Sequence, residues 1–154
     1  MYGKKTVPVL HSVVKGLKRG RSANSEAPTL DSIEKGEGWC QITLAGLIPS
    51  LNGTDGLIRE PWWKRKKRLQ AMTWRLQVLG IPQFTQKVKV DLTFYHSLLA
   101  DEDSLAGRFK IIGDSLVALK VLMDDSPKYL SLSKPEQIKS RRKDQCMKIF
   151  IKKI

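Results

Sequence analysis

Acidic side chains occur at both ends of residues 100–130, within a chain that is strongly basic. The chain contains 28 Lys and Arg residues against 15 Asp and Glu residues, which gives a net charge of +13. The charged residues of interest in this segment are Asp101, Glu102, Asp103, Lys110, Asp114, Asp124 and Asp125. Carboxylate oxygens are preferred ligands of hard cations such as Mg²⁺, and a cation beside a phosphate can activate water for hydrolysis. These acids therefore form a candidate metal site for phosphodiester hydrolysis.

The segment has the periodicity of an amphipathic helix. Its apolar residues recur at steps of four, three, four and three: Leu105, Phe109, Ile112, Leu116 and Leu119. At 100° per residue, Asp103, Lys110 and Asp114 lie within about 20° of one another, opposite the apolar stripe. The alternative is a helix whose charged face is only solvated. The unpaired acidic residues at both ends of the segment favour the metal site over this alternative.

The length of this helix limits which acids share a cation. A straight helix from Asp103 to Met123 would be roughly 30 Å long, whereas paired metals lie only about 3.5–4 Å apart. Asp125 can join Asp103 only if the helix is shorter or breaks near Gly113, or if Asp125 comes from a second subunit. Asp114 lies some 16 Å along the axis from Asp103, which favours a supporting role.

A second helix is predicted after Pro61, which suits a first helical turn. Its apolar stripe comprises Leu69, Met72, Leu76 and Leu79, and Gly80 ends it. Five consecutive cations follow a pair of tryptophans: Lys64, Arg65, Lys66, Lys67 and Arg68. We expect these cations to contact phosphates and Trp62 and Trp63 to stack on bases. The alternative is a solvated helix face with the tryptophans in the core.

Alternating residues predict strands at 39–44, 87–95 and 147–151, with a short strand at 129–133. Arg141 and Arg142 lie in a basic loop before the last strand and are a further candidate for phosphate contact. Two helices among these strands predict a small α+β domain, with both helices packed on a mixed sheet. Residues 1–36 carry many cations and few apolar residues, so we predict a flexible basic extension there and a folded domain at 37–154.

Several function classes are disfavoured by composition. Cys40 and Cys146 are the only cysteines, too few for a disulfide scaffold or a cysteine-based zinc site. No apolar run reaches the roughly 20 residues of a membrane span, and no signal peptide is evident. We therefore expect a cytoplasmic protein without a membrane partner. His96 precedes the acids by five residues, although a lone histidine is more often structural.

The spacing of the charged residues is similar to that of the RusA family of Holliday-junction resolvases. The matching positions are Asp101, Asp103, Leu105, Lys110, Asp114, Asp124 and Asp125. Ser126 to Tyr129 is similar to phage-borne members, and the resemblance covers about residues 39–154. Ser104 stands where the family usually has Asn. The interval from Asp103 to Lys110 is longer than in short members, so Gly107 or Arg108 competes for the lysine position. Lys110 is favoured, because its spacing to Asp114 and Asp124 fits the family.

The resemblance implies a homodimeric endonuclease that resolves four-way DNA junctions by symmetric nicking in a bacterial or phage-infected cell. Mg²⁺ or Mn²⁺ would be held by Asp101, Asp103 and Asp125, with Asp124 as a further ligand or as an acceptor that orients one. Lys110 would stabilise charge on the phosphate, and Asn52 would lie near the DNA. The alternative, drawn from charge alone, is a non-catalytic basic DNA-binding or architectural protein.

Overall fold

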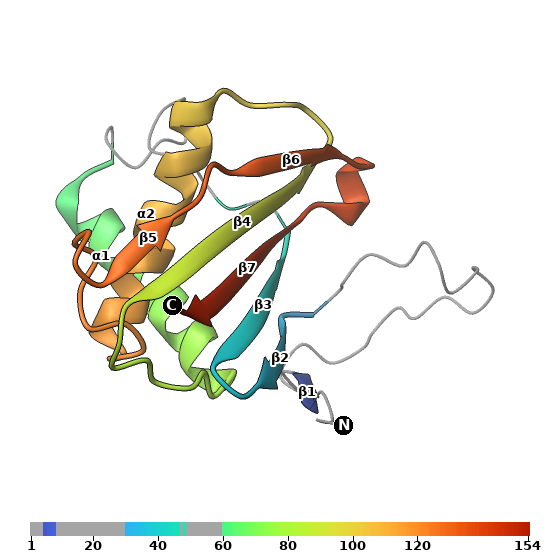
Figure 1. The fold of residues 1–154 in the computed structure, drawn as a ribbon. Coiled ribbons are helices and arrows are strands. Elements are labelled where there is room, and N and C mark those ends of the chain that lie inside the picture. Colours follow the sequence, from blue (N-terminus) through green and yellow to red (C-terminus); the bar gives the residue numbers. More distant parts are fainter. Residues whose placement is uncertain (1–4, 9–29, 47, 49–59) are drawn as a thin grey trace.

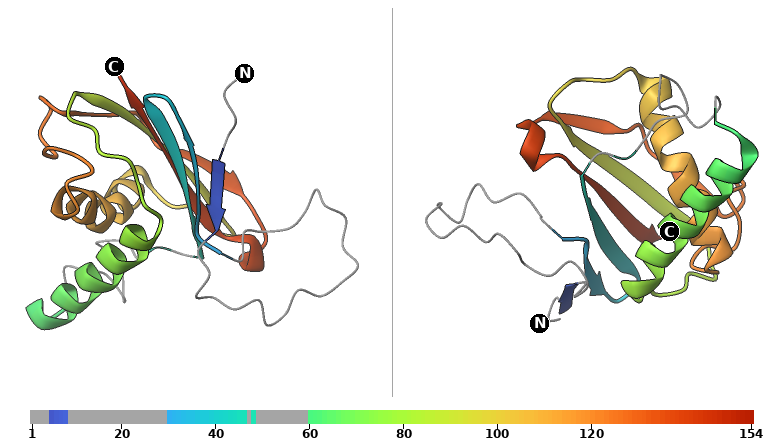
Figure 2. Two further views of the ribbon diagram at one scale, coloured as in Figure 1. Left: turned by 90° about the horizontal axis from the view of Figure 1, so that it is seen from below. Right: turned by 180° about the vertical axis from the view of Figure 1, so that it is seen from behind.

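The computed structural model describes residues 5–8, 30–46, 48 and 60–154. A mixed seven-stranded sheet carries two helices on one of its faces, as Figures 1 and 2 show from three directions. The predicted α+β class, with two helices packed on a mixed sheet, is confirmed.

The strands are ordered β1-β2-β3-β7-β4-β5 across the sheet, and β6 also pairs with β4. Neighbouring strands are antiparallel, except that β5 and β6 run parallel to β4 along the same edge. Their bounds are β1 Lys5–Pro8, β2 Ser32–Gly36, β3 Trp39–Ala45, β4 Val88–His96, β5 Leu130–Leu132, β6 Glu136–Lys139 and β7 Cys146–Lys153.

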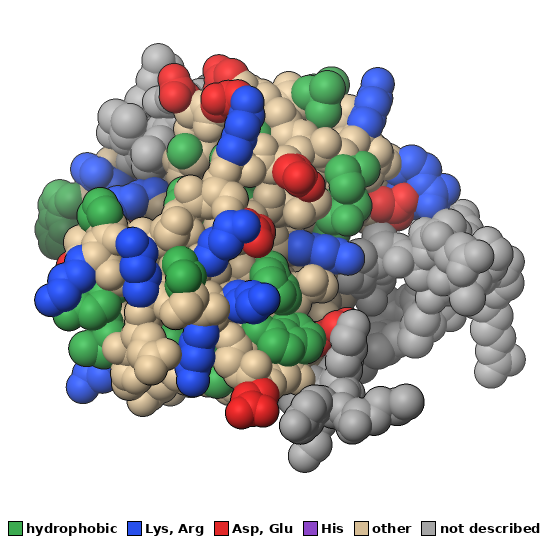
Figure 3. All heavy atoms as spheres, in the orientation of Figure 1, with side chains coloured by type: hydrophobic (Ala, Val, Ile, Leu, Met, Phe, Trp, Pro, Cys, Tyr) green, Lys and Arg blue, Asp and Glu red, His purple; other side chains and the backbone are tan. Residues whose placement is uncertain are grey.

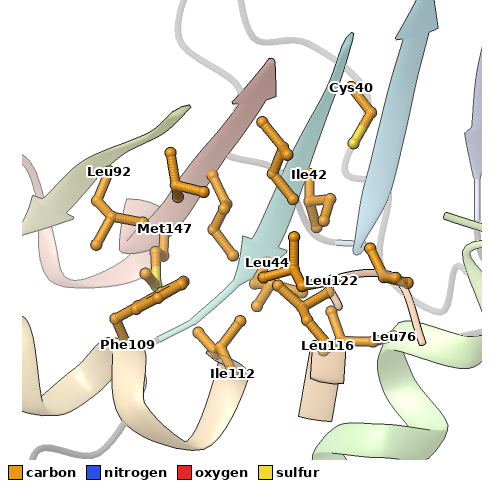
Figure 4. Close-up of a cluster of buried hydrophobic side chains, with 14 of the residues drawn as sticks. Cys40, Ile42, Leu44, Leu76, Leu92, Phe109, Ile112, Leu116, Leu122 and Met147 are labelled. Atoms are coloured by element: carbon orange, nitrogen blue, oxygen red, sulfur yellow. The ribbon is translucent and has the colours of Figure 1, made fainter. Parts of the chain in front are cut away.

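The three central strands face the helices with alternate residues. Ile149 of β7 lies opposite Ile42 of β3 on one side and Leu92 of β4 on the other, and all three side chains are buried. Figure 4 shows Ile42 and Leu92 on the side of the sheet that faces Phe109 and Leu116 of helix α2 (Glu102–Ala118). Alternation places the intervening residues on the sheet face that neither helix covers.

Helix α1 (Trp62–Val78) packs beside α2 through a narrow apolar stripe. Met72 and Leu76 are buried, and Leu79 at the C-terminal cap is 1% exposed, as the sequence predicts. Gly80 then takes a φ of 61°, a left-handed conformation that a glycine adopts without strain. Trp62 and Trp63 are 72% and 46% exposed, so the alternative that they pack in the core is wrong.

Helix α2 is shorter than a continuous helix to Met123 would be. Leu119 is its C-terminal cap, and Lys120 follows with a φ of 58°, in the left-handed region. Val121 N then donates to Leu116 O at 2.9 Å, which turns the chain back. Of the alternatives left open by the sequence, the shorter helix is the one observed, and it brings residues 121–125 back alongside α2.

The sheet extends into the region predicted to be a flexible extension. Ile33 of β2 is fully buried and pairs with Ile42 of β3. Asp31, 9% exposed, accepts hydrogen bonds from the Arg75 guanidinium and from Ala45 N at 2.9 Å, and so ties β2 and β3 to α1. Residues 5–8 and 30–36 therefore belong to the folded domain, and the predicted boundary at residue 37 is corrected. Residues 1–4 and 9–29 lie outside the described part.

The predicted basic loop before the last strand also contains regular structure. It includes β6 and a short 3₁₀ helix, η1 (Arg142–Asp144). Across the described ranges, no helix has the length and apolar character needed to cross a membrane.

Candidate functional site

Three acids lie at the start of α2 and form what we call the N-terminal acidic group: Asp101, Glu102 and Asp103. Acidic side chains gather at this end of the molecule in Figure 3. Asp101 caps the helix, because its Oδ1 accepts a hydrogen bond from Ser104 N at 2.8 Å. Hydrogen bonds from the hydroxyl and backbone amide of Ser104 lower the Asp101 pKa below its usual range. Ser104 thus holds Asp101 in its charged form.

The other two members of this group differ in their partners. Glu102 forms an ion pair with Lys134 of the β5–β6 connection, with 2.6 Å between Oε1 and Nζ. Asp103 is exposed and forms no ion pair or side-chain hydrogen bond with any described residue. A carboxylate near a helix N-terminus is favoured by the helix dipole, but nothing else in the described fold uses Asp103.

A central acidic group lies further along the same exposed side of α2: Asp114, Asp124 and Asp125, together with Lys110. Lys110 Nζ lies 2.9 Å from Asp114 Oδ1 and 3.4 Å from Asp125 Oδ2. Asp114 first, and then Asp125, raise the Lys110 pKa above its usual value. Lys110 therefore carries a full positive charge among the carboxylates, close to the return of the chain.

Asp124 is held by the turn that follows. Its Oδ1 accepts a hydrogen bond from Asp125 N at 2.9 Å. Hydrogen bonds from Ser126 and from the Asp125 backbone lower the Asp124 pKa. Asp124 thus remains charged next to Asp125, which contacts Lys110.

The two acidic groups remain separate within one chain. Lys110 is seven residues from Asp103, which corresponds to about 10 Å along the helix axis. Within the described ranges, no three Asp, Glu, His or Cys side chains are placed to hold one metal ion. The structure therefore brings Asp125 to Lys110 and Asp114, but does not gather it with Asp101 and Asp103 in one chain.

Arg108, which competed with Lys110 for the lysine position, lies on a different side of α2. Its Nη1 donates to Ile48 O at 2.8 Å, and its side chain is half-buried. His96 is buried at 2% exposure and stacks on Phe94, away from the carboxylates. Lys110 is thus the cation placed among the acids, and His96 is not grouped with them.

Cations of the predicted DNA-binding surface lie along the first half of α1. Lys64, Arg65, Lys66 and Lys67 are exposed, and the ammonium groups of Lys64 and Lys67 each lie 5.5 Å from the Trp63 ring centroid. Arg68 is more buried and pairs with Glu60 at 2.5 Å, so its charge is partly neutralised. Asn52 lies outside the described residues.

Arg141 and Arg142 are exposed at η1, near the end of β4. Arg141 pairs with Asp144 at 2.5 Å, whereas Arg142 has no ion pair with a described acid. Lys and Arg side chains are also scattered over the strands of the uncovered sheet face (Figure 3). The sequence does not single out that face, because its lysines are spread over separate strands.

Comparison with known proteins adds no relative: no protein-family model and no curated protein matches the chain.

Proposed function

We propose that the protein is a metal-dependent endodeoxyribonuclease that cuts branched DNA such as a four-way junction, like the RusA-type resolvases it resembles. The observation that carries this proposal is the exposed carboxylate of Asp103, which has no partner among the described residues and lies on the same helical side as Lys110 and its acids. At the first turn of α2, with no cationic partner among the described residues, this carboxylate is free to hold a cation.

The carboxylates fit Mg²⁺ or Mn²⁺ by their chemistry, because both cations prefer oxygen ligands. Asp101 caps α2, yet a carboxylate has about four lone-pair sites, so capping leaves capacity for a cation. When bound, such a cation would supply an activated water for in-line attack on a phosphodiester. Asp101 and Asp103 would hold it, and Asp125, assisted by Asp124, would complete the ligand set.

Two subunits would complete each site. The axial separation of about 10 Å between Asp103 and Lys110 of one α2 favours pairing the N-terminal group of one subunit with the central group of another. A two-fold homodimer then has two equal sites, which matches the near two-fold symmetry of a four-way junction. A protein that remains monomeric by light scattering in the presence of junction DNA would contradict this arrangement.

Lys110 would stabilise the negative charge that develops on the attacked phosphate. Its ammonium is held by Asp114, so it needs little reorganisation when a phosphate arrives. The exposed cations of α1, together with Arg141 and Arg142, would grip DNA phosphates without reading sequence.

The alternative is a non-catalytic basic DNA-binding protein. The exposed cations and tryptophans of α1 support it as well as they support a nuclease. The two proposals differ in the role of Asp103, because a pure binding protein does not need this carboxylate. In such a protein, removal of the Asp103 charge would strengthen DNA binding, since it lowers the negative charge near the phosphates.

The test is cleavage of a synthetic four-way junction and of a linear duplex of the same sequence, with Mg²⁺, Mn²⁺ or EDTA. We expect symmetric nicks in the junction alone, abolished by EDTA. Asp103→Asn should slow cleavage at least about 100-fold while retaining junction binding. Glu102→Gln is the matched control, because it removes the same charge from a residue already paired with Lys134. Tight junction binding without cleavage in either metal would instead support the architectural protein.

A further inference from the structure

A cavity of about 360 Å³ lies where the end of β4, the helix α2 and the short helix η1 meet. This cavity is distinct from both acidic groups. Its lining residues, which we call the β4-end pocket, are His96, Ser97, Leu98, Arg108, Arg142 and Gln145. Two of the six are arginines and none is an acid, so the pocket is electropositive.

His96 is the most enclosed of these residues. It ends the row of buried β4 side chains that faces α2, is 2% exposed, and stacks on Phe94 with 5.3 Å between ring centroids. Its Nε2 is buried and has no hydrogen-bond partner in the described part of the chain. Buried polar atoms are nearly always paired, so an unpaired one on a cavity wall indicates a ligand that pairs with it.

Arg108 has the same property. Its Nη1 donates to Ile48 O at 2.8 Å, while its Nε is buried and has no partner among the described residues. Neither Arg108 nor Arg142 forms an ion pair with an acid within the described ranges. A half-buried guanidinium with no counter-ion is costly, and this cost is offset when an anion binds beside it.

Gln145 adds a further fixed donor. Its Oε1 accepts hydrogen bonds from Ser97 N at 3.3 Å and from Ser97 Oγ at 3.2 Å. These bonds orient the amide and leave its NH₂ group without a partner among the described residues. The pocket thus offers N–H donors from His96, Arg108, Arg142 and Gln145 to one ligand.

We propose that the β4-end pocket binds a phosphate group of a DNA strand. Guanidinium groups match phosphate oxygens in geometry and charge, and the side chains named above supply donors without a competing carboxylate. A volume of about 360 Å³ is within the range of small-molecule sites, so a phosphate with its attached sugar can enter. The choice of a DNA phosphate rests on the proposed function, whereas the donor set by itself indicates an oxyanion.

Protonation of His96 is coupled to this binding. Burial, and then the nearby Arg108, lower the His96 pKa, so the empty pocket holds a neutral imidazole at pH 7. The charged groups that line the pocket with it are Arg108 of α2 and Arg142 of η1. A bound phosphate adds negative charge beside the ring and raises the His96 pKa. Phosphate should therefore bind more tightly as the pH falls.

The imidazole of His96 can be observed directly, because His11 and His96 are the only histidines. We would record ¹⁵N-edited NMR spectra of full-length His11→Gln protein without divalent metal. The ligands would be inorganic phosphate, a short single-stranded DNA with a 5′-phosphate, and the same DNA without it. We expect saturable shifts of the His96 signals with phosphate and with both strands, and a raised His96 pKa in each complex. Absence of any saturable His96 shift would overturn the proposal.

Matched variants distinguish phosphate binding in the pocket from nonspecific attraction of phosphate to the basic surface. Arg142→Gln should weaken phosphate binding at least about tenfold, because a hydrogen bond to a charged group is lost. Lys143→Gln removes the same charge from the next exposed residue, which does not line the pocket, and should leave the affinity within about twofold. Equal weakening in both variants would overturn the proposal.

The ligand series also separates the sources of phosphate. Saturation by inorganic phosphate without saturation by either strand would assign the pocket to the free anion and overturn the DNA assignment. If only the nuclease proposal is wrong, the result is different. DNA would still shift the His96 signals, but the four-way junction would remain uncut in Mg²⁺. The two proposals therefore fail independently.

Discussion

The two acidic groups of α2 lie on one side of one helix but differ in how their charges are compensated. In the central group, Lys110 contacts both Asp114 and Asp125. In the N-terminal group, Asp101 is used as a helix cap and Glu102 is paired with Lys134, whereas Asp103 has no partner in the described fold. Each acid of the two groups that makes a contact therefore has an ordinary structural role. Asp103 has no such role in the described fold. Asp103 is therefore the candidate ligand without a structural contact, whereas Asp101 and Asp125 would hold the cation in addition to their structural contacts.

Asp101 can be used to separate capping from cation binding. Asn caps helices about as well as Asp, whereas Ala does not. Asp101→Asn should keep the melting temperature within a degree or two and Asp101→Ala should lower it by a few degrees. Both variants should lose cleavage at least about 100-fold, because both lose a charged ligand. Calorimetry and junction nicking measure the two effects, and an active Asp101→Asn protein would confine Asp101 to capping.

Substitution of the lysines that pair with the two acidic groups, Lys110 and Lys134, should have different effects on cleavage. Lys110→Met should slow junction cleavage about 100-fold, because a charge aimed at the phosphate is lost. The free energy of unfolding should change by less than about 1 kcal/mol, since the ion pairs are exposed. Lys134→Met removes the partner of Glu102 and should leave the single-turnover rate unchanged. Equal loss of rate in both variants would remove the distinction between the groups.

Asp31 provides a reference for an acid with a purely structural role. Asp31→Asn should lower the free energy of unfolding by about 2–3 kcal/mol, because the half-buried Arg75 loses its counter-ion. Urea denaturation measures this change. Asp91→Asn is the control, because Asp91 forms an exposed pair with Lys89 at 3.3 Å and should cost less than about 1 kcal/mol. Folded Asp31→Asn protein should cleave at the wild-type rate, and a lower rate would show that the reference is not purely structural.

The cations of α1 should show the smallest single effects. Lys66→Gln should lower the slope of log affinity for junction DNA against log salt by about 0.9, the value of one phosphate contact. Arg68→Gln should change the slope less, because Glu60 already neutralises Arg68. Fluorescence anisotropy at several salt concentrations measures both slopes. A larger change for Arg68→Gln would show that the pair with Glu60 opens on DNA.

Periodicity predicts the parts of the fold whose residues alternate between core and solvent. Strands β3, β4 and β7 and both helices follow from it, because each buries a regular stripe. Strand β2 has a single buried residue, Ile33, and β6 has none, so neither has a pattern that sequence analysis detects. These short strands lie outside the central three, where pairing with a neighbour, rather than burial, determines the strand.

The candidate site was only partly predictable for a similar reason. The shared side of Asp103, Lys110 and Asp114 follows from helical geometry. The return of Asp125 to Lys110 depends on Lys120 in a left-handed conformation, where a glycine would have given a signal. The β4-end pocket combines His96, Arg108 and Arg142, which only strand register and helix packing bring together. No local pattern in the sequence contains it.

The most direct test of the account is whether the two acidic groups of different subunits act on one phosphodiester. Asp103→Asn and Asp125→Asn proteins would be mixed, unfolded, refolded together and tested for nicking of a four-way junction in Mg²⁺. Each variant alone should be inactive. A mixed dimer would contain one site with both groups intact, so the mixture should recover about a quarter of the wild-type nicking rate. A mixture as inactive as its components, beside an active refolded wild type, would contradict the shared site.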